Sequence, residues 1–176
     1  MPLVLFEIRD NIALLTLNNP EKRNMLTFEV CEMIVDYVAQ AEQHPDVKAL
    51  IVTGNGPAFC AGGQLTDITA DQLMLENIYS GFLSIAQCEL PTIAAVNGPA
   101  VGAGFNMAVG CDVRIVTEKS RFEPRFFGLG LHPGGGNSWM LRQLVNWNTA
   151  AGMLLFYQSI TGQEAVEKGL AWKCVK

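Results

Sequence analysis

The chain has 176 residues, of which 49% are hydrophobic and 16% are charged. That balance provides for a large buried core, so it excludes a disordered protein and predicts a single domain over residues 1–176. The formal net charge of −5 argues against nucleic acid or an anionic membrane as the partner, because both are bound by basic surfaces.

The first third of the chain predicts a hairpin, a helix and a buried strand. Two short β-type runs, 3–8 and 12–17, are joined by a turn. Thr27 is a good N-cap for a helix over 28–42, whose apolar residues recur on one stripe. The continuous apolar run 49–53 is typical of a strand that is buried on both faces.

The remainder of the chain continues to alternate strands and helices. The strands that we expect lie at 93–96, 113–116 and 171–175, with an extended segment at 121–127. The helices that we expect are one at 71–87, a short one at 105–109, one that Asn137 or Ser138 caps and that runs to Leu144, one at 149–156 and a short one capped near Thr161. This alternation predicts an α/β fold with a largely parallel sheet.

Two glycine-rich segments each follow a buried strand. The first is F-C-A-G-G-Q-L at 59–65, and the second contains Gly102, Ala103 and Gly104. A tight turn that demands small residues explains one such segment alone. A dinucleotide-binding fingerprint is excluded, because G-x-G-x-x-G from Gly102 would need glycine at Met107.

Small residues at the start of a helix leave backbone N–H groups that have no partner inside the helix. Such groups can hold an anion or a polarised carbonyl oxygen. Because the pattern of strand, small residues and helix occurs twice, two N–H groups could converge on one oxygen. The sequence therefore predicts an oxyanion hole that is built without charged side chains.

Several motifs then point to one family. They are L-N-N-P-E-K-R-N-M-L, F-C-A-G-G-Q-L, P-T-I-A-A-V-N-G-P-A-V-G-A-G, C-D-V-R-I-V, the G-L-x-P-G-G-G loop and T-G-Q-E-A-V-E-K-G-L-A. In this order they resemble the enoyl-CoA hydratase/isomerase (crotonase) family over essentially the whole chain. The resemblance implies a ββα spiral core, a fatty acyl- or enoyl-CoA thioester as the ligand, no other cofactor and no metal, and a homotrimer or hexamer.

The resemblance also assigns roles by position. The two oxyanion-hole amides would be those of Gly63 and Ala103. The other residues that it places against the substrate are Lys22, Arg23 and Asn24 near the coenzyme A phosphates, Ala61, Gln64, Leu65 and Thr66 along the coenzyme A, and Asn106 and Phe126 at the acyl group.

The chain departs from the family at its proton-transfer positions. Asn106 and Phe126 stand where hydratases carry two glutamates, and Gln64 stands where an acid is usual. Neither Asn nor Phe can transfer a proton, which argues against hydration. Double-bond isomerisation, decarboxylation or hydrolysis fits better. The alternative is a catalytically inactive acyl-CoA-binding protein, a carrier or regulator.

Few groups are left for acid or base chemistry. His132 in the glycine-rich loop and Asp67 near the pocket mouth are the candidates. Glu123 lies three residues before Phe126, and on an extended strand it would face the other way. Arg125, where the family prefers proline, is expected to contact Glu123 or a neighbouring subunit.

The cysteines and histidines do not form a visible site. The five cysteines are scattered and lack a C-x-x-C pair, which predicts reduced packing residues in a cytoplasmic protein. Cys60 is assigned to packing as well. The two histidines are far apart in the sequence. No run of about eighteen apolar residues is available to span a bilayer.

Family members usually continue past the strand expected at 171–175 into C-terminal helices. The resemblance therefore implies that the C-terminal helical part of this chain is short or missing.

Overall fold

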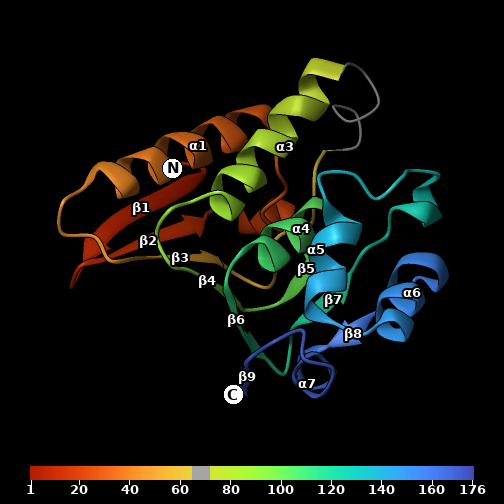
Figure 1. Cartoon of the computed structure of the whole chain (residues 1–176). Helices are drawn as coiled ribbons and strands as arrows, with labels where there is room; N and C mark the ends of the chain where they lie inside the picture. The colour runs from red at the N-terminus through yellow and green to blue at the C-terminus, as the bar shows by residue number, and fades with distance from the viewer. Residues whose placement is uncertain (65–71) are drawn as a thin grey trace.

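The computed structural model describes residues 1–64 and 72–176 (Figure 1). In this part of the chain a six-stranded sheet has the order β1-β2-β3-β4-β6-β9. Its strands are β1 (Val4–Arg9), β2 (Ile12–Leu17), β3 (Ala49–Gly54), β4 (Thr92–Val96), β6 (Val113–Thr117) and β9 (Lys173–Val175). The β1–β2 hairpin is antiparallel and every other pair is parallel, so the predicted α/β class is confirmed.

A three-stranded sheet accompanies it within the described residues. It consists of β5 (Pro99–Val101), β7 (Arg121–Glu123) and β8 (Ile160–Thr161), in the order β5-β7-β8. Because β5 comes directly after β4 and directly before the second glycine-rich turn, this small sheet holds that turn at the end of the main sheet.

Helices α1 (Phe28–Gln43) and α3 (Gln72–Ala86) pack against each other along one face of the main sheet (Figure 1). Thr27 caps α1 by accepting the Val30 N–H, as expected. The predicted apolar stripe of α1 is buried, because a helix of this length stays folded mainly by packing such a face. Of the predicted stripe, Val30, Ile34, Val38 and Ala41 are buried, while Met33 and Tyr37 are half-buried. Cys31, outside the predicted stripe, is buried as well.

Helix α4 (Ala103–Gly110) packs against α3 and leads into β6. The helices that follow α4 along the described chain are the 3-10 helix η2 (Phe127–Leu129), α5 (Asn137–Leu144), α6 (Trp147–Phe156) and α7 (Gly162–Glu167). Figure 1 shows α5, α6 and α7 on the side of the molecule away from α1. A further 3-10 helix, η1 (Pro20–Lys22), precedes α1. At α7, Thr161 and Glu164 form a capping box. Hydrogen bonds from Thr161 lower the pKa of the Glu164 carboxyl, which keeps it in the charged form that accepts them.

Two expectations about local structure were wrong. The segment 121–127 is extended only to Glu123, because Pro124 lacks an N–H and cannot extend the ladder. Phe126 is then helical, with φ −60° and ψ −58°. At α5 the cap is Gly136, with φ 77°, and not Asn137 or Ser138. Asn137 is fully buried instead.

The core is continuous from the hairpin to α7 and includes residues from both sheets. Its largest fully buried side chains include Phe59, Phe82, Phe105 and Phe122. Phe105 and Phe122 contact each other with ring centroids 5.7 Å apart, which joins α4 to β7 beneath the second glycine-rich turn. No helix of the described chain is long and apolar enough to cross a membrane.

Candidate active site

The first glycine-rich turn is pinned to the chain that precedes α1. Leu26 donates its N–H to the Gly62 oxygen at 2.8 Å and accepts the Gln64 N–H at 3.0 Å. Leu26 thus bonds to Gly62 and to Gln64, as in a parallel bridge. Gly63, which lies between these two residues, directs its own N–H away from Leu26. That N–H has no hydrogen-bond partner among residues 1–64 and 72–176.

The second turn presents a similar group. Ala103 is the first residue of α4, so its N–H has no acceptor within the helix. It finds no acceptor elsewhere in the described chain either. The residue before it, Gly102, has φ 52° and donates its N–H to the Glu123 oxygen at 2.9 Å. Strand β7 therefore fixes the geometry from which α4 begins.

The two turns are in direct contact, and glycine makes this approach possible. A side chain on Gly62, whose φ is 95°, would place its Cβ 2.8 Å from the Val101 oxygen and 3.5 Å from the Ala103 nitrogen. Such a Cβ would collide with the Val101 carbonyl. The unpartnered N–H groups of Gly63 and Ala103 thus lie on adjacent turns.

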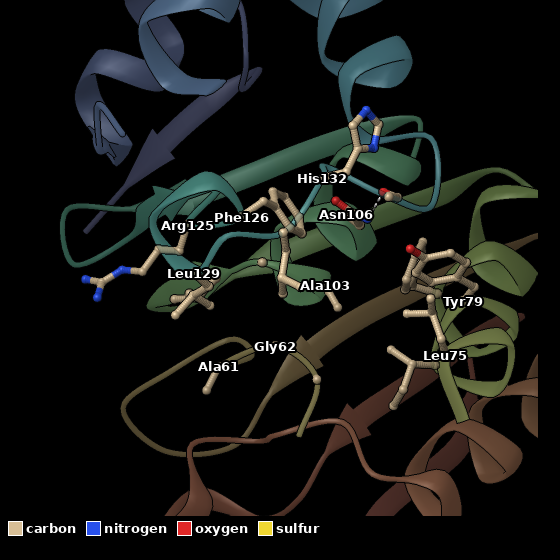
Figure 2. A pocket seen from close by; sticks show the side chains of 17 residues that line it. Ala61, Gly62, Leu75, Tyr79, Ala103, Asn106, Arg125, Phe126, Leu129 and His132 are labelled. Atoms are coloured by element: carbon tan, nitrogen blue, oxygen red, sulfur yellow. Dashed lines mark hydrogen bonds between the residues drawn. The ribbon is translucent and has the colours of Figure 1, made fainter. Parts of the chain in front are cut away.

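Both turns open on one cavity of about 340 Å³ (Figure 2). Helix α3 forms the opposite wall, and the segment from Arg125 to Gly134 closes the rest. Most of the lining is apolar or backbone: Ala61, Gly62, Gly63, Leu75, Ile78, Phe82, Val101, Gly102, Ala103, Phe126, Leu129, Leu131 and Gly134. The cavity therefore suits a largely apolar group with a polarisable oxygen at the turns.

Four polar side chains complete the described lining: Tyr79, Asn106, Arg125 and His132. No carboxylate belongs to this set. Asn106 is 1% exposed, and its Nδ2 donates to the Gly134 oxygen at 3.0 Å. Its Oδ1 accepts from Nδ2 of the buried Asn137 at 2.5 Å. Both ends of the Asn106 amide are therefore occupied within the protein.

His132 and Arg125 face outward from the cavity. Figure 2 shows the His132 imidazole pointing away from Gly62 and Leu75, and its side chain is exposed. Arg125 forms the expected ion pair with Glu123, with Nη2 and Oε2 2.6 Å apart. Glu123 is outside the cavity lining, as expected, although its side chain is only 16% exposed.

Tyr79 is a lining residue that the sequence analysis missed. Its ring packs edge-on against Phe82, with centroids 5.6 Å apart. Its hydroxyl lies against Gly134, where an added Cβ would be 1.7 Å from Oη. Burial raises the pKa of the Tyr79 phenol. In the sequence, Tyr79 stood out only as a residue with a hydroxyl among the apolar residues of the predicted helix 71–87.

The other predicted substrate residues are spread around the first turn. Lys22 and Arg23 are exposed, and the Arg23 oxygen accepts the Ala61 N–H at 2.9 Å, which ties the two cations to the cavity rim. Asn24 is 2% exposed, and its Nδ2 donates to backbone oxygens at 2.8–3.3 Å inside the loop. Gln64 is not in the cavity lining.

Three predicted residues, Leu65, Thr66 and Asp67, lie outside the described residues. Cys60 is fully buried, and burial raises the pKa of its thiol to about 12, so the predicted packing role holds. Among the residues that the structure describes, no group of three or more His, Cys, Asp or Glu side chains could hold a metal ion.

Comparison with known proteins identifies the family. The family model for enoyl-CoA hydratase/isomerase matches residues 7–176. The chain belongs to the enoyl-CoA hydratase/isomerase family. A probable enoyl-CoA hydratase of Mycobacterium tuberculosis strain H37Rv is 44% identical over 173 residues, which cover 96% of this chain and 68% of that protein.

The chain is also similar to proteins that bear other names. The 1,2-epoxyphenylacetyl-CoA isomerase of Escherichia coli K12 is 31% identical, covering 99% of this chain and 70% of that protein. Among solved structures, an enoyl-CoA hydratase from Bacillus anthracis superposes with a TM-score of 0.93 at 26% identity, covering 99% and 70% of the two chains. The expected crotonase-like fold is thereby confirmed, and this chain spans about two thirds of each relative.

Proposed function

We propose that this protein binds a fatty acyl- or enoyl-CoA thioester and polarises its carbonyl oxygen with the N–H groups of Gly63 and Ala103. The observation that carries the proposal is the pair of unpartnered amides on adjacent turns that open on one cavity. Two preorganised donors aimed at one oxygen stabilise the negative charge that develops when a thioester becomes an enolate.

The residues around these amides suit the acyl group and the coenzyme A phosphates of the proposed ligand. The apolar lining between α3 and Phe126 suits a hydrocarbon acyl group. The cations Lys22 and Arg23 would bind the phosphates of coenzyme A, which is supported by their exposure and by the hydrogen bond that joins Arg23 to Ala61 at the rim. The proposal includes no metal and no cofactor besides the coenzyme A that the substrate carries.

The chemistry that we propose is an isomerase-, decarboxylase- or hydrolase-type reaction rather than hydration. Hydration needs groups that hold and activate water, and the described lining offers no carboxylate. The Asn106 amide is engaged with Gly134 and Asn137, and Phe126 is apolar. His132 and Asp67 remain the proposed acid–base candidates.

A second candidate function is an acyl-CoA carrier or regulator without catalytic activity. It is favoured by the same absence of a carboxylate from the described lining, and by the outward direction of the His132 ring (Figure 2). The two candidates share the binding site and differ only in whether a bound thioester is converted.

We also propose that the protein assembles as a homotrimer or hexamer. Large apolar side chains are strongly exposed on α6 and near it, among them Trp147, Leu155 and Phe156 at 66%, 54% and 77%. Neighbouring exposed apolar groups of this size often mark an interface. Light scattering at tens of micromolar checks this proposal, and a monomer alone would contradict it.

Titration calorimetry with octanoyl-CoA tests the proposed function. We expect saturable binding at micromolar levels or tighter, with competition by free coenzyme A. The absence of heat together with the absence of competition would reject the proposal. Incubation with a panel of 2-enoyl-, 3-enoyl- and 3-oxoacyl-CoA thioesters, followed by mass spectrometry and ultraviolet absorbance, then separates an enzyme from a carrier.

A further inference from the structure

The acyl part of the cavity contains one side-chain hydroxyl, that of Tyr79, among the described lining residues. We propose that Tyr79 is a specificity-determining residue whose hydroxyl donates a hydrogen bond to an oxygen atom on the acyl group. The preferred ligand would then be an oxygen-bearing acyl thioester, with a hydroxyl or carbonyl group on its chain, rather than a plain hydrocarbon. This inference rests on the proposed thioester binding.

The position of Tyr79 places its hydroxyl beyond the thioester carbonyl. From Ala103, where that carbonyl would bind, Asn106 lies about one turn further along α4. Asn106 holds the Gly134 oxygen, and Gly134 in turn contacts the Tyr79 hydroxyl. Figure 2 shows this hydroxyl on the side of the Tyr79 ring that faces Asn106. An acyl chain that enters past the two turns therefore meets it within its first few carbons.

The Tyr79 hydroxyl is available for a ligand. No hydrogen bond joins it to the described residues, and it is not one of the buried side-chain atoms that lack a partner, so it is open to the cavity. The neighbouring polar side chains are committed elsewhere, since Asn106 binds Gly134 and Asn137, and Arg125 pairs with Glu123. A ligand oxygen that enters the cavity can therefore accept the hydrogen bond of this hydroxyl in place of solvent.

The chemistry of the phenol determines which ligand atom it selects. Burial raises the pKa of Tyr79, so the phenol stays protonated at neutral pH and acts as a donor. The matching ligand atom is therefore an acceptor such as a hydroxyl, keto or epoxide oxygen. The other lining residues of α3, Leu75, Ile78 and Phe82, offer only apolar contact.

Titration calorimetry with matched ligands tests the inference. The ligands are octanoyl-CoA and octanoyl-CoA hydroxylated at carbon 3, 4 or 5, and the variants are the parent, Tyr79→Phe and Tyr37→Phe. The parent should bind at least one hydroxylated ligand roughly 2- to 12-fold more tightly than octanoyl-CoA. Tyr79→Phe should lose that preference and keep its affinity for octanoyl-CoA.

Tyr37→Phe is the matched control, because Tyr37 stacks on Phe6 at 4.9 Å and is not part of this cavity. It should keep the preference of the parent. Octanoyl-CoA binding without any preference in the parent, or a preference that survives Tyr79→Phe, would overturn the role of Tyr79 alone. Failure of all four ligands to bind the parent would overturn the proposed function together with this inference.

Discussion

Asn137 donates a hydrogen bond from its Nδ2 to Oδ1 of Asn106 at 2.5 Å, and the two side chains are 0% and 1% exposed. Asn106 in turn donates a hydrogen bond from its Nδ2 to the Gly134 oxygen at 3.0 Å. This pair joins the first turn of α5 to α4 and holds the glycine loop against the cavity. Asn106 is therefore a positioning residue in this structure, at a position where the resemblance to the family predicts a glutamate in the hydratases.

The pair predicts a specific loss of stability. Asn137→Leu leaves the buried Oδ1 of Asn106 without a donor, and the free energy of unfolding should fall by about 1–3 kcal/mol. Urea denaturation followed by fluorescence measures the change. Ser138→Ala, one residue further on the exposed side of α5, is the control and should change stability by less than about 0.5 kcal/mol.

A double-mutant cycle completes this measurement. Asn137→Leu leaves the Asn106 amide without its donor, and adding Asn106→Leu removes that amide as well. The free energy of unfolding of the double variant should therefore fall by less than the sum of the decreases in the two single variants. A coupling of at least about 0.5 kcal/mol is expected for residues in contact. Strict additivity would show that the two amides do not depend on each other.

Local patterns were enough to predict much of the fold. The stripe of α1, the Thr27 cap and the hairpin depend on residues that are near one another in the sequence, and all three are confirmed. The burial of the Asn137 side chain could not be predicted in this way. It depends on a hydrogen bond to Asn106, 31 residues earlier, and not on the local capping preference of asparagine.

The candidate site was predictable to the extent that it is built from backbone. The glycine-rich segments predicted two turns that approach closely, which only small residues allow. The resemblance to the family then assigned the amides of Gly63 and Ala103 to them. Tyr79 was missed, because an aromatic residue in an amphipathic helix normally packs in the core. Its exposure to the cavity depends on the packing of α3 against α4, which the sequence pattern does not specify.

The amide of Ala103 can be removed with little damage to the helix. Ala103→Pro eliminates the N–H at the first position of α4, where proline is tolerated because that group has no partner within the helix. Any enolate-forming turnover should fall by about 10²–10³-fold. Ala103→Gly keeps the N–H and is the matched control. Equal rates for a folded proline variant and the parent would mean that another group binds the oxygen.

The buried thiols predict a loss of stability in alkali. Burial raises the pKa of Cys31, Cys60 and Cys111 from 9.0 to about 12. The unfolded chain then releases these protons from about pH 9 while the folded chain keeps them, so stability falls between pH 9 and pH 12. From pH 8 to pH 10 each thiol should remove about 1.4 kcal/mol from the free energy of unfolding.

Cys31→Ala is the variant that checks this contribution. Urea denaturation at pH 8 and at pH 10 gives the change in unfolding free energy between the two pH values. In Cys31→Ala this change should be smaller by about the amount that one thiol contributes. Replacement of the half-buried Cys174 by alanine is the matched control, because that thiol is not enclosed in the core, and it should affect this change little. An unchanged pH dependence in Cys31→Ala would contradict the assignment.

Hydration of crotonyl-CoA should be very slow in this protein. Asn106 and Phe126 line the cavity but cannot transfer protons, and each missing acid–base group removes typically ~10²–10⁴-fold in rate. The parent should therefore hydrate crotonyl-CoA well below ~1 s⁻¹, the lower end for typical enzymes. Asn106→Glu combined with Phe126→Glu should raise hydration measurably, as loss of absorbance of the enoyl thioester. The variant should also unfold more easily, because a carboxylate cannot donate to the Gly134 oxygen.

Asn106→Gln with Phe126→Gln is the control for this experiment, because glutamine has nearly the size of glutamate but cannot transfer a proton. It should hydrate no faster than the parent. If the parent itself hydrates crotonyl-CoA at roughly 1–10³ s⁻¹, the two glutamate positions are misplaced. Glu123 would then be the first residue to mutate, since its carboxylate lies next to the cavity wall and is paired with Arg125. Loss of that activity in Glu123→Gln, with Arg125→Gln retaining it, would assign the proton transfer to Glu123.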